Sequence, residues 1–186
     1  MPQRLKSRKN LLVLIGFILI LALLAIRFIR KTPPNLSNSN KKESVAAATA
    51  SVDLNREFHF PIEKVTRGEP RKISFVIEKA ELRDEIVIKG QKANAVAGRA
   101  FLILQVKLRN ELDRGLEINT KDYVRLAYKD ADTEWFAADI HNDPVAVQAI
   151  STKSTRLGFP VDDDIRSFIL QVGPINGSKD KIDVQF

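Results

Sequence analysis

Three residues with the chemistry of an acid–base catalyst stand close together in the stretch DIHNDP: Asp139, His141 and Asp143. A carboxylate beside a histidine can orient the imidazole as a general base, which a hydrolase needs. The same stretch also has a structural interpretation, because Asn-Asp-Pro commonly ends a strand in a turn. We therefore keep an envelope enzyme, or an accessory to one, as the alternative function, with its site around these three residues.

Other catalytic signals are missing from the sequence. The chain has no cysteine, and it lacks the G-x-S-x-G, H-E-x-x-H and phosphate-binding glycine motifs. His59 alternates with two phenylalanines, so we expect it on the outer face of a surface strand rather than in a metal site. The acidic stretches at 130–134 and 162–164 offer oxygens that calcium prefers, but neither has the spacing of a complete calcium loop. We expect solvated hairpin tips there, no catalytic residue, no metal and no cofactor.

Trp135 and Phe136 are the aromatic candidates for binding. Successive residues of a strand face opposite sides, so we expect one of the two rings in the core and the other at the surface. An exposed aromatic ring is a place where a β-sandwich can bind a partner. Together with His141, these two residues are the binding candidates of this sequence.

Short strands are the elements that must position these residues. Apolar and polar residues alternate with a period of two in eight or nine segments of residues 57–186, without a convincing soluble helix. In one of them the alternation shifts phase between Ile77 and Ala80, which indicates a bulge. Many short strands with turns between them predict an all-β fold. We expect an immunoglobulin-like antiparallel β-sandwich over residues 57–186.

The stretch FLILQVKLRNELDRG, residues 101–115, contains the strand that we expect to be the most central. Its first half is apolar on both faces, whereas its second half is apolar only on the face of Leu104 and Val106. This pattern predicts a central strand that leaves a covered region and runs toward solvent. Asn110 is expected to end the strand, because its short side chain suits hydrogen bonds to the backbone of a turn.

Residues 11–29 form an apolar stretch interrupted only by Arg27. As a helix this stretch is about 28 Å long, close to the ~30 Å hydrocarbon core of a bilayer, and Arg27 can extend its side chain to the head groups. A cleaved signal peptide would need small residues directly after the stretch, but the nearest suitable ones lie at 48–51. A buried core helix would show an amphipathic face, which this stretch lacks. We therefore predict a transmembrane helix in the lipid bilayer.

The net charge of +7 does not describe the folded part of the chain. Residues 1–42 hold nine of the 30 basic residues and none of the 23 acidic ones, so the remainder has 21 basic and 23 acidic residues, a net charge of −2. This part lacks the basic footprint of a nucleic-acid binder, and we expect no nucleic-acid partner. Residues 30–56 are rich in Pro, Asn, Ser and Ala and are predicted to be a flexible linker.

Five segments follow one another in an order typical of a known family: FVIEKAEL, FLILQVKLRNELDRGLEI, VRLAYKDADTEWF, STKSTRLGFPVDDDIRSFILQVG and KIDVQF. They span residues 73–186, and the strand that ends at Asn110 is the most specific part. Their order resembles the bacterial immunoglobulin-like extracytoplasmic domains of unknown function, which are related in fold to secreted mycobacterial immunogenic antigens. The chain departs from common members because it has no lipobox cysteine and no glycine in the hairpin DADTE. The resemblance implies a domain outside the cytoplasmic membrane but no activity and no catalytic residue.

These observations predict a single-pass membrane protein with a basic cytoplasmic tail at 1–10 and an extracytoplasmic C-terminal domain. We expect the domain to act as a non-enzymatic binding or scaffolding module at the cell surface, with a protein or an envelope polymer as its partner. A reversed orientation, with a sensor domain in the cytoplasm, is the remaining alternative.

The orientation can be tested with protease. Four basic residues and the α-amino group lie within the nine positions before the apolar stretch, against Arg27, Arg30 and Lys31 at its other end, which favours a cytoplasmic N-terminus. Protease added to intact spheroplasts should therefore cleave the chain beyond Thr32 and leave an N-terminal tag protected. Full protection of the C-terminal domain, with a digested N-terminal tag, would reverse the topology.

Overall fold

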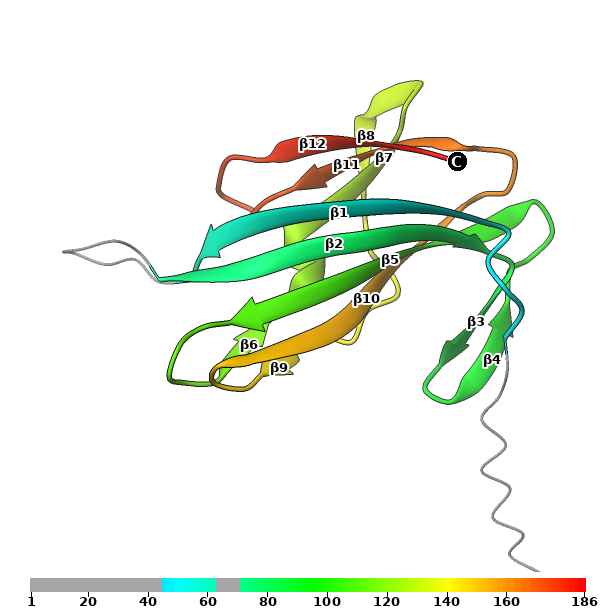
Figure 1. Cartoon of the computed structure of the whole chain (residues 1–186). Coiled ribbons are helices and arrows are strands. Elements are labelled where there is room, and N and C mark those ends of the chain that lie inside the picture. The colour runs from blue at the N-terminus through cyan, green and yellow to red at the C-terminus, as the bar shows by residue number, and fades with distance from the viewer. Residues whose placement is uncertain (1–44, 63–70) are drawn as a thin grey trace, which may run out of the picture. The chain divides into compact units, whose positions relative to one another are not determined.

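The computed structural model, which describes residues 45–62 and 71–186 except for the side chains of Asp132 and Thr133, is an antiparallel β-sandwich (Figure 1). The first sheet has the strand order β1-β2-β5-β10 and the second the order β12-β11-β7-β8. The first sheet consists of β1 (Ala50–Pro61), β2 (Lys72–Arg83), β5 (Arg99–Asn110) and β10 (Ser151–Asp162). The second consists of β12 (Asp180–Gln185), β11 (Ser167–Val172), β7 (Val124–Tyr128) and β8 (Ala131–Ala137).

Two pairs of short strands and one helical turn complete the described part of the chain. Strand β3 (Glu85–Ile88) pairs with β4 (Gln91–Asn94), and β6 (Leu116–Ile118) pairs with β9 (Val145–Val147). The helical element of this part is a single 3-10 turn, η1 (Thr120–Tyr123). The predicted all-β class is therefore confirmed.

One hydrophobic core fills the space between the two sheets. Strand β5 contributes Leu102, Leu104, Val106 and Leu108, each at most 1% exposed, and β11 contributes Phe168, Leu170 and Val172 from the opposite sheet. Because side chains alternate across each sheet, the period-two pattern of the sequence becomes an inner apolar face and an outer polar face. The predicted inward position of Leu104 is confirmed.

The outer face of the first sheet is covered over part of its length. Ile103 points away from the central core but is only 1% exposed, and it lines a small cavity together with Ile86 and Val87 of the β3–β4 hairpin. A side chain on Gly158 would be impossible here, because its Cβ would lie 2.7 Å from Cδ1 of Ile103 and 2.9 Å from Cβ of Ile140. The first half of β5 is thus covered on both faces, as its composition predicts.

One other local prediction has a clear outcome, and one strand forms where the sequence does not indicate it. The register of β2 against β5 shifts between Ile77 and Lys79, which confirms the predicted bulge. Residues 91–94 form strand β4, although their small and polar residues indicate a loop. The hairpin turn at Gly90, with a φ of +80°, brings them beside β3, and this pairing overrides the weak local preference.

The boundary of the linker also needs correction. Strand β1 begins at Ala50, so residues 50–56 belong to the sandwich and not to a linker that ends at 56. Val52 and Leu54 are half-buried and pack against the core, and the exposed Ser51 and Asp53 alternate with them as in a strand. The predicted tail, transmembrane helix and remaining linker lie outside the described residues. Within residues 45–62 and 71–186, no helix has the length and apolarity needed to cross a membrane.

The register of β5 can be tested by two substitutions on opposite faces of the strand. Leu104→Asp would bury a carboxylate without a partner and should lower the free energy of unfolding by about 4 kcal/mol. Lys107→Asp removes an ion pair with Glu78 on a partly exposed face and should cost about 1 kcal/mol or less. Urea-induced unfolding measures both changes. Equal losses would mean that the register of β5 is wrong.

Candidate functional site

The carboxylate of Asp143 is held by the start of η1. Its Oδ1 accepts hydrogen bonds from the backbone N–H of Thr120 at 2.8 Å and from the Thr120 hydroxyl at 2.6 Å. Its Oδ2 accepts one from the backbone N–H of Lys121 at 2.8 Å. The Asp143 side chain is 2% exposed, so these donors replace water around the carboxylate. This residue therefore anchors the loop before β9 to the turn before β7.

His141 meets the same carboxylate but has a looser position. Its Nδ1 lies 3.6 Å from Oδ2 of Asp143 and accepts the backbone N–H of Asp143 at 3.2 Å. This hydrogen bond places the proton of the neutral imidazole on Nε2. The imidazole thus closes a local turn. This geometry agrees with the structural interpretation of the stretch as an Asn-Asp-Pro turn.

Asp139 does not join the other two residues. Its backbone N–H donates to the carbonyl of Gly158 at 3.0 Å, and the next residue, Ile140, forms a β-bridge with Gly158. Among the described residues no hydrogen bond or ion pair links its carboxylate to His141 or Asp143. The structure therefore brings together two of the three predicted catalytic candidates and points the third elsewhere.

The remaining polar candidates lie at the surface. His59 is exposed on β1, with Nε2 4.0 Å from Oε1 of Glu57, as expected for a surface strand. Asp162 forms an ion pair with Arg99, Oδ1 to Nη1 at 2.6 Å. Over residues 45–62 and 71–186 no group of three or more His, Asp or Glu side chains could hold a metal ion.

The expectation that one aromatic ring of the Trp135–Phe136 pair enters the core is wrong. Phe136 is 37% exposed, and Trp135 is half-buried with Nζ of Lys181 at 5.4 Å from its ring centroid. The reason is that β8 is the last strand of the second sheet. A side chain that faces inward from the last strand has protein on one side and solvent on the other.

Phe136 opens onto a groove between the edges of the two sheets. This groove, which we call the edge groove, has a volume of about 470 Å³ and lies between β8 and β10. Leu126, Tyr128, Phe136 and Phe159 form its apolar lining, and Arg99, Asp139 and Asp162 contribute its charged groups. The rings of Tyr128 and Phe136 are 5.8 Å apart. Such a combination of apolar walls and few polar groups is typical of binding sites.

The hydroxyl of Tyr128 stays protonated in this groove. Burial raises the pKa of Tyr128 above its ordinary value, and the neighbouring Asp162 carboxylate adds to the increase. The group is therefore neutral throughout the physiological range, and its hydroxyl is hydrogen-bonded to Asp162 at the wall of the groove.

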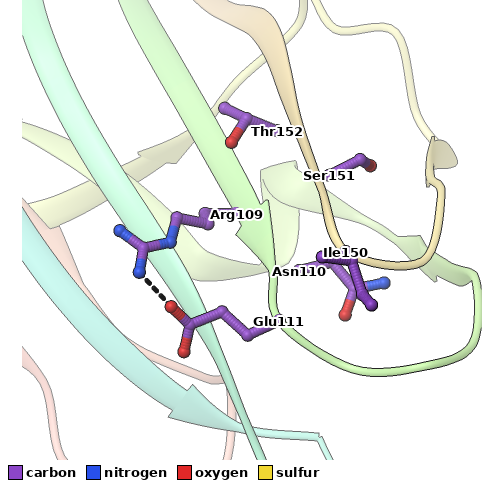
Figure 2. A pocket seen from close by; sticks show the side chains of 6 residues that line it. All are labelled: Arg109, Asn110, Glu111, Ile150, Ser151 and Thr152. Atoms are coloured by element: carbon purple, nitrogen blue, oxygen red, sulfur yellow. Dashed lines mark hydrogen bonds and ion pairs between the residues drawn. The ribbon is translucent and has the colours of Figure 1, made fainter.

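A second hollow lies at the opposite end of β5 (Figure 2). Its volume is about 370 Å³, and Arg109 and Glu111 form an ion pair at its rim. Asn110 is 1% exposed and donates from Nδ2 to the carbonyls of Arg114 at 2.7 Å and Gln148 at 2.9 Å. These bonds tie two loops together and confirm the expected role of Asn110 at the strand end.

Ile150, on the same hollow, is a residue that sequence reasoning missed. Its φ is +47°, a left-handed conformation that β-branched residues rarely adopt, and it is 78% exposed. Its backbone N–H donates to the carbonyl of Leu112 at 2.9 Å, which holds this conformation in place. No sequence pattern signals it, because the usual residues for such a position are glycine and asparagine.

The fold and these sites define a β-sandwich protein with an open edge groove and no metal cluster among its described residues. No known family model and no curated protein matches the chain. The chain is similar in fold to several solved structures, three of which are uncharacterised proteins. A conserved hypothetical protein from Bacillus anthracis has 12% identity and a TM-score of 0.49, with coverage of 72% of this chain and 96% of that chain.

The other two structures are also uncharacterised. A β-sandwich protein from Clostridium difficile 630 has 16% identity and a TM-score of 0.45, covering 60% of this chain and 84% of its own. A functionally unknown protein from Listeria monocytogenes EGD-e has 13% identity and a TM-score of 0.44, covering 75% and 86%. At this level of similarity the comparisons carry no argument about activity or ligand.

The structural role of Asp143 can be separated from a catalytic one by its effect on stability. Asp143→Ala would leave the buried Thr120 hydroxyl and two backbone N–H groups without an acceptor, so unfolding should become easier by about 3 kcal/mol. His141→Ala should cost only about 0.5 kcal/mol, because one hydrogen bond at a partly exposed turn is lost. Chemical denaturation measures both. If the two losses are equal, or if Asp143→Ala is neutral, the anchoring role is contradicted.

Proposed function

We propose that this chain is a single-pass membrane protein whose immunoglobulin-like domain acts outside the cell as a non-enzymatic binding or scaffolding module. The anchor would be the apolar stretch at residues 11–29, with the N-terminus in the cytoplasm. The partner would be a protein or a polymer of the cell envelope. An acidic balance in the remainder of the chain, with a net charge of −2 beyond residue 42, argues against nucleic acid.

An immunoglobulin-like class is supported by the way the chain moves between the sheets. Strands β1, β2 and β5 lie in the first sheet, β7 and β8 in the second, β10 in the first again, and β11 and β12 in the second. Neighbouring strands of both sheets pair antiparallel throughout. Such crossings between two packed antiparallel sheets are characteristic of immunoglobulin-like sandwiches.

The observation that carries the binding function is the exposure of Phe136 in the edge groove. A large aromatic side chain that faces inward is normally buried, and here it is 37% exposed beside Tyr128. Nearby, Asp139 and the Arg99–Asp162 ion pair supply polar groups that can orient a ligand. A partner that fills this groove would cover the apolar surface that the sandwich leaves open.

The alternative enzyme is less well supported by the same geometry. Asp143 already accepts three hydrogen bonds and is nearly inaccessible, so it is occupied as an anchor. No carboxylate of the described residues is hydrogen-bonded to His141, since that of Asp143 lies 3.6 Å from Nδ1, which instead accepts a backbone N–H. A catalytic role would require this loop to rearrange, whereas a binding role requires no rearrangement of the edge groove.

The proposal can be tested by photo-crosslinking in intact cells. A photoreactive amino acid in place of Phe136 should form a covalent adduct under ultraviolet light, and mass spectrometry would identify the partner. The same amino acid at Val96, which is 72% exposed and does not line the edge groove, is the matched control and should form no adduct. The adduct should persist when His141→Ala is added.

Two results would contradict the proposal. Absence of an adduct at position 136, in cells that express the folded chain, would argue against a partner at the edge groove. Loss of the adduct with His141→Ala, while circular dichroism shows an intact fold, would favour a catalytic or metal site around His141 over a binding module.

A further inference from the structure

We propose that the partner binds by strand addition: an extended protein segment pairs with the free edge of β8 and places an apolar side chain in the edge groove and a basic side chain against Asp139. This inference rests on the proposed binding function and specifies its ligand. The segment would carry the basic and the apolar residue two positions apart.

The free edge of β8 is the first observation. Within the described part of the chain β8 pairs only with β7, so its other edge offers backbone N–H and C=O groups to a further strand. The facing edge of β10 is closed where Ile140 and Gly158 exchange backbone hydrogen bonds of 3.1 and 2.7 Å. An added strand can therefore pair with β8 but finds β10 occupied at Gly158.

The position of Phe136 supplies the apolar subsite. Phe136 is the register partner of Leu126, which is 1% exposed, so both side chains face the inside of the sandwich. A residue paired with Phe136 on an added strand would face the same way and enter the edge groove. There it would contact the exposed side of Phe136 and continue the apolar surface formed with Tyr128 and Phe159.

The negative charge of Asp139 in the groove favours a lysine or arginine near that apolar residue of the added strand. Asp139 is exposed, and no described residue gives its carboxylate a partner. Arg99, the basic group in the groove lining, is already in an ion pair with Asp162. Residues two apart on a strand lie on one face about 7 Å from each other. A lysine or arginine at this spacing from the apolar residue can approach Asp139, which lies two residues beyond the end of β8.

Charge also argues against a second copy of the chain as the occupant. Antiparallel pairing of β8 with β8 of another copy would bring Glu134 and Asp139 of both copies to one short interface. Like charges facing each other across paired strands are destabilising. An envelope polysaccharide lacks the regular spacing of donors and acceptors that would pair with the N–H and C=O groups along the edge of β8. A protein strand has this spacing and therefore fits the edge better.

The experiment uses the full-length chain in detergent micelles and three labelled peptides. The first peptide is extended and threonine-rich, with one lysine two positions from one valine. The second has the same side chains but N-methylated backbone groups at alternate positions, which prevents strand pairing. The third has glutamate in place of the lysine. Fluorescence anisotropy gives the affinities, and hydrogen exchange reports protection of residues 131–137.

Strand addition predicts that the first peptide binds and slows hydrogen exchange in β8. The N-methylated and glutamate peptides should bind at least about tenfold more weakly, which corresponds to about 1.4 kcal/mol. Phe136→Ser and Asp139→Asn should each weaken the first peptide by about tenfold, and Val96→Ser should leave its affinity unchanged. Because Asp139 is exposed, Asp139→Asn tests the site even if Phe136→Ser disturbs the fold.

The proposal is overturned if the N-methylated peptide binds as well as the first, if the exchange of β8 does not change, or if none of the peptides binds. Failure here can be separated from failure of the proposed function. A crosslinked partner at position 136 without peptide binding would leave a binding module whose ligand is not an added strand. A crosslinked polysaccharide or a second copy of the chain would identify that other occupant.

Discussion

The burial of β5 on both of its faces is the constraint on which the rest of the structure depends. One face packs Leu102, Leu104 and Val106 into the core, and the opposite face needs a separate cover for Ile103. The β3–β4 hairpin and Ile140 provide this cover, and the absence of a side chain at Gly158 makes room for it. Removal of apolar side chains from water on both faces stabilises this central strand. It also requires the β3–β4 hairpin and the segment around Ile140 to pass over its outer face.

The cover over β5 also decides where the sandwich remains open. When the chain leaves β8, it must cross to β10 so that Ile140 can bridge Gly158, and this crossing closes part of one sheet edge. The segment then continues to Asp143, whose carboxylate anchors η1. Residues 139–144, which contain the candidate catalytic residues, thus connect the two sheets. The outer edge of β8 has no pairing strand in the described part of the chain, and Phe136 is exposed.

The hollow at the end of β5 and the edge groove use polar and apolar groups in different ways. At the end of β5, the buried amide of Asn110 satisfies backbone carbonyls of two loops, and the exposed Ile150 holds an unfavourable backbone conformation beside it. In the edge groove, by contrast, the ring of Phe136 is exposed, while Asp139 has no described partner. The first arrangement stabilises loops within the domain, and the second leaves interactions available for a ligand.

The sequence alone determined most of the long strands, the covered and solvated halves of β5, the bulge of β2 and the turn at Asn110, because each depends on a local period or on the chemistry of one turn. Of the residues that line the edge groove, it singled out Phe136, Asp139 and, within the acidic stretch 162–164, Asp162, but it did not predict that they lie together. Only the tertiary structure decided that β8 is an edge strand, that Asp143 anchors a turn distant in sequence, and that residues 50–56 belong to β1. These features depend on contacts between segments far apart in the chain. The alternation within one segment cannot predict them, because it shows which face of a strand is apolar but not which other segment covers that face.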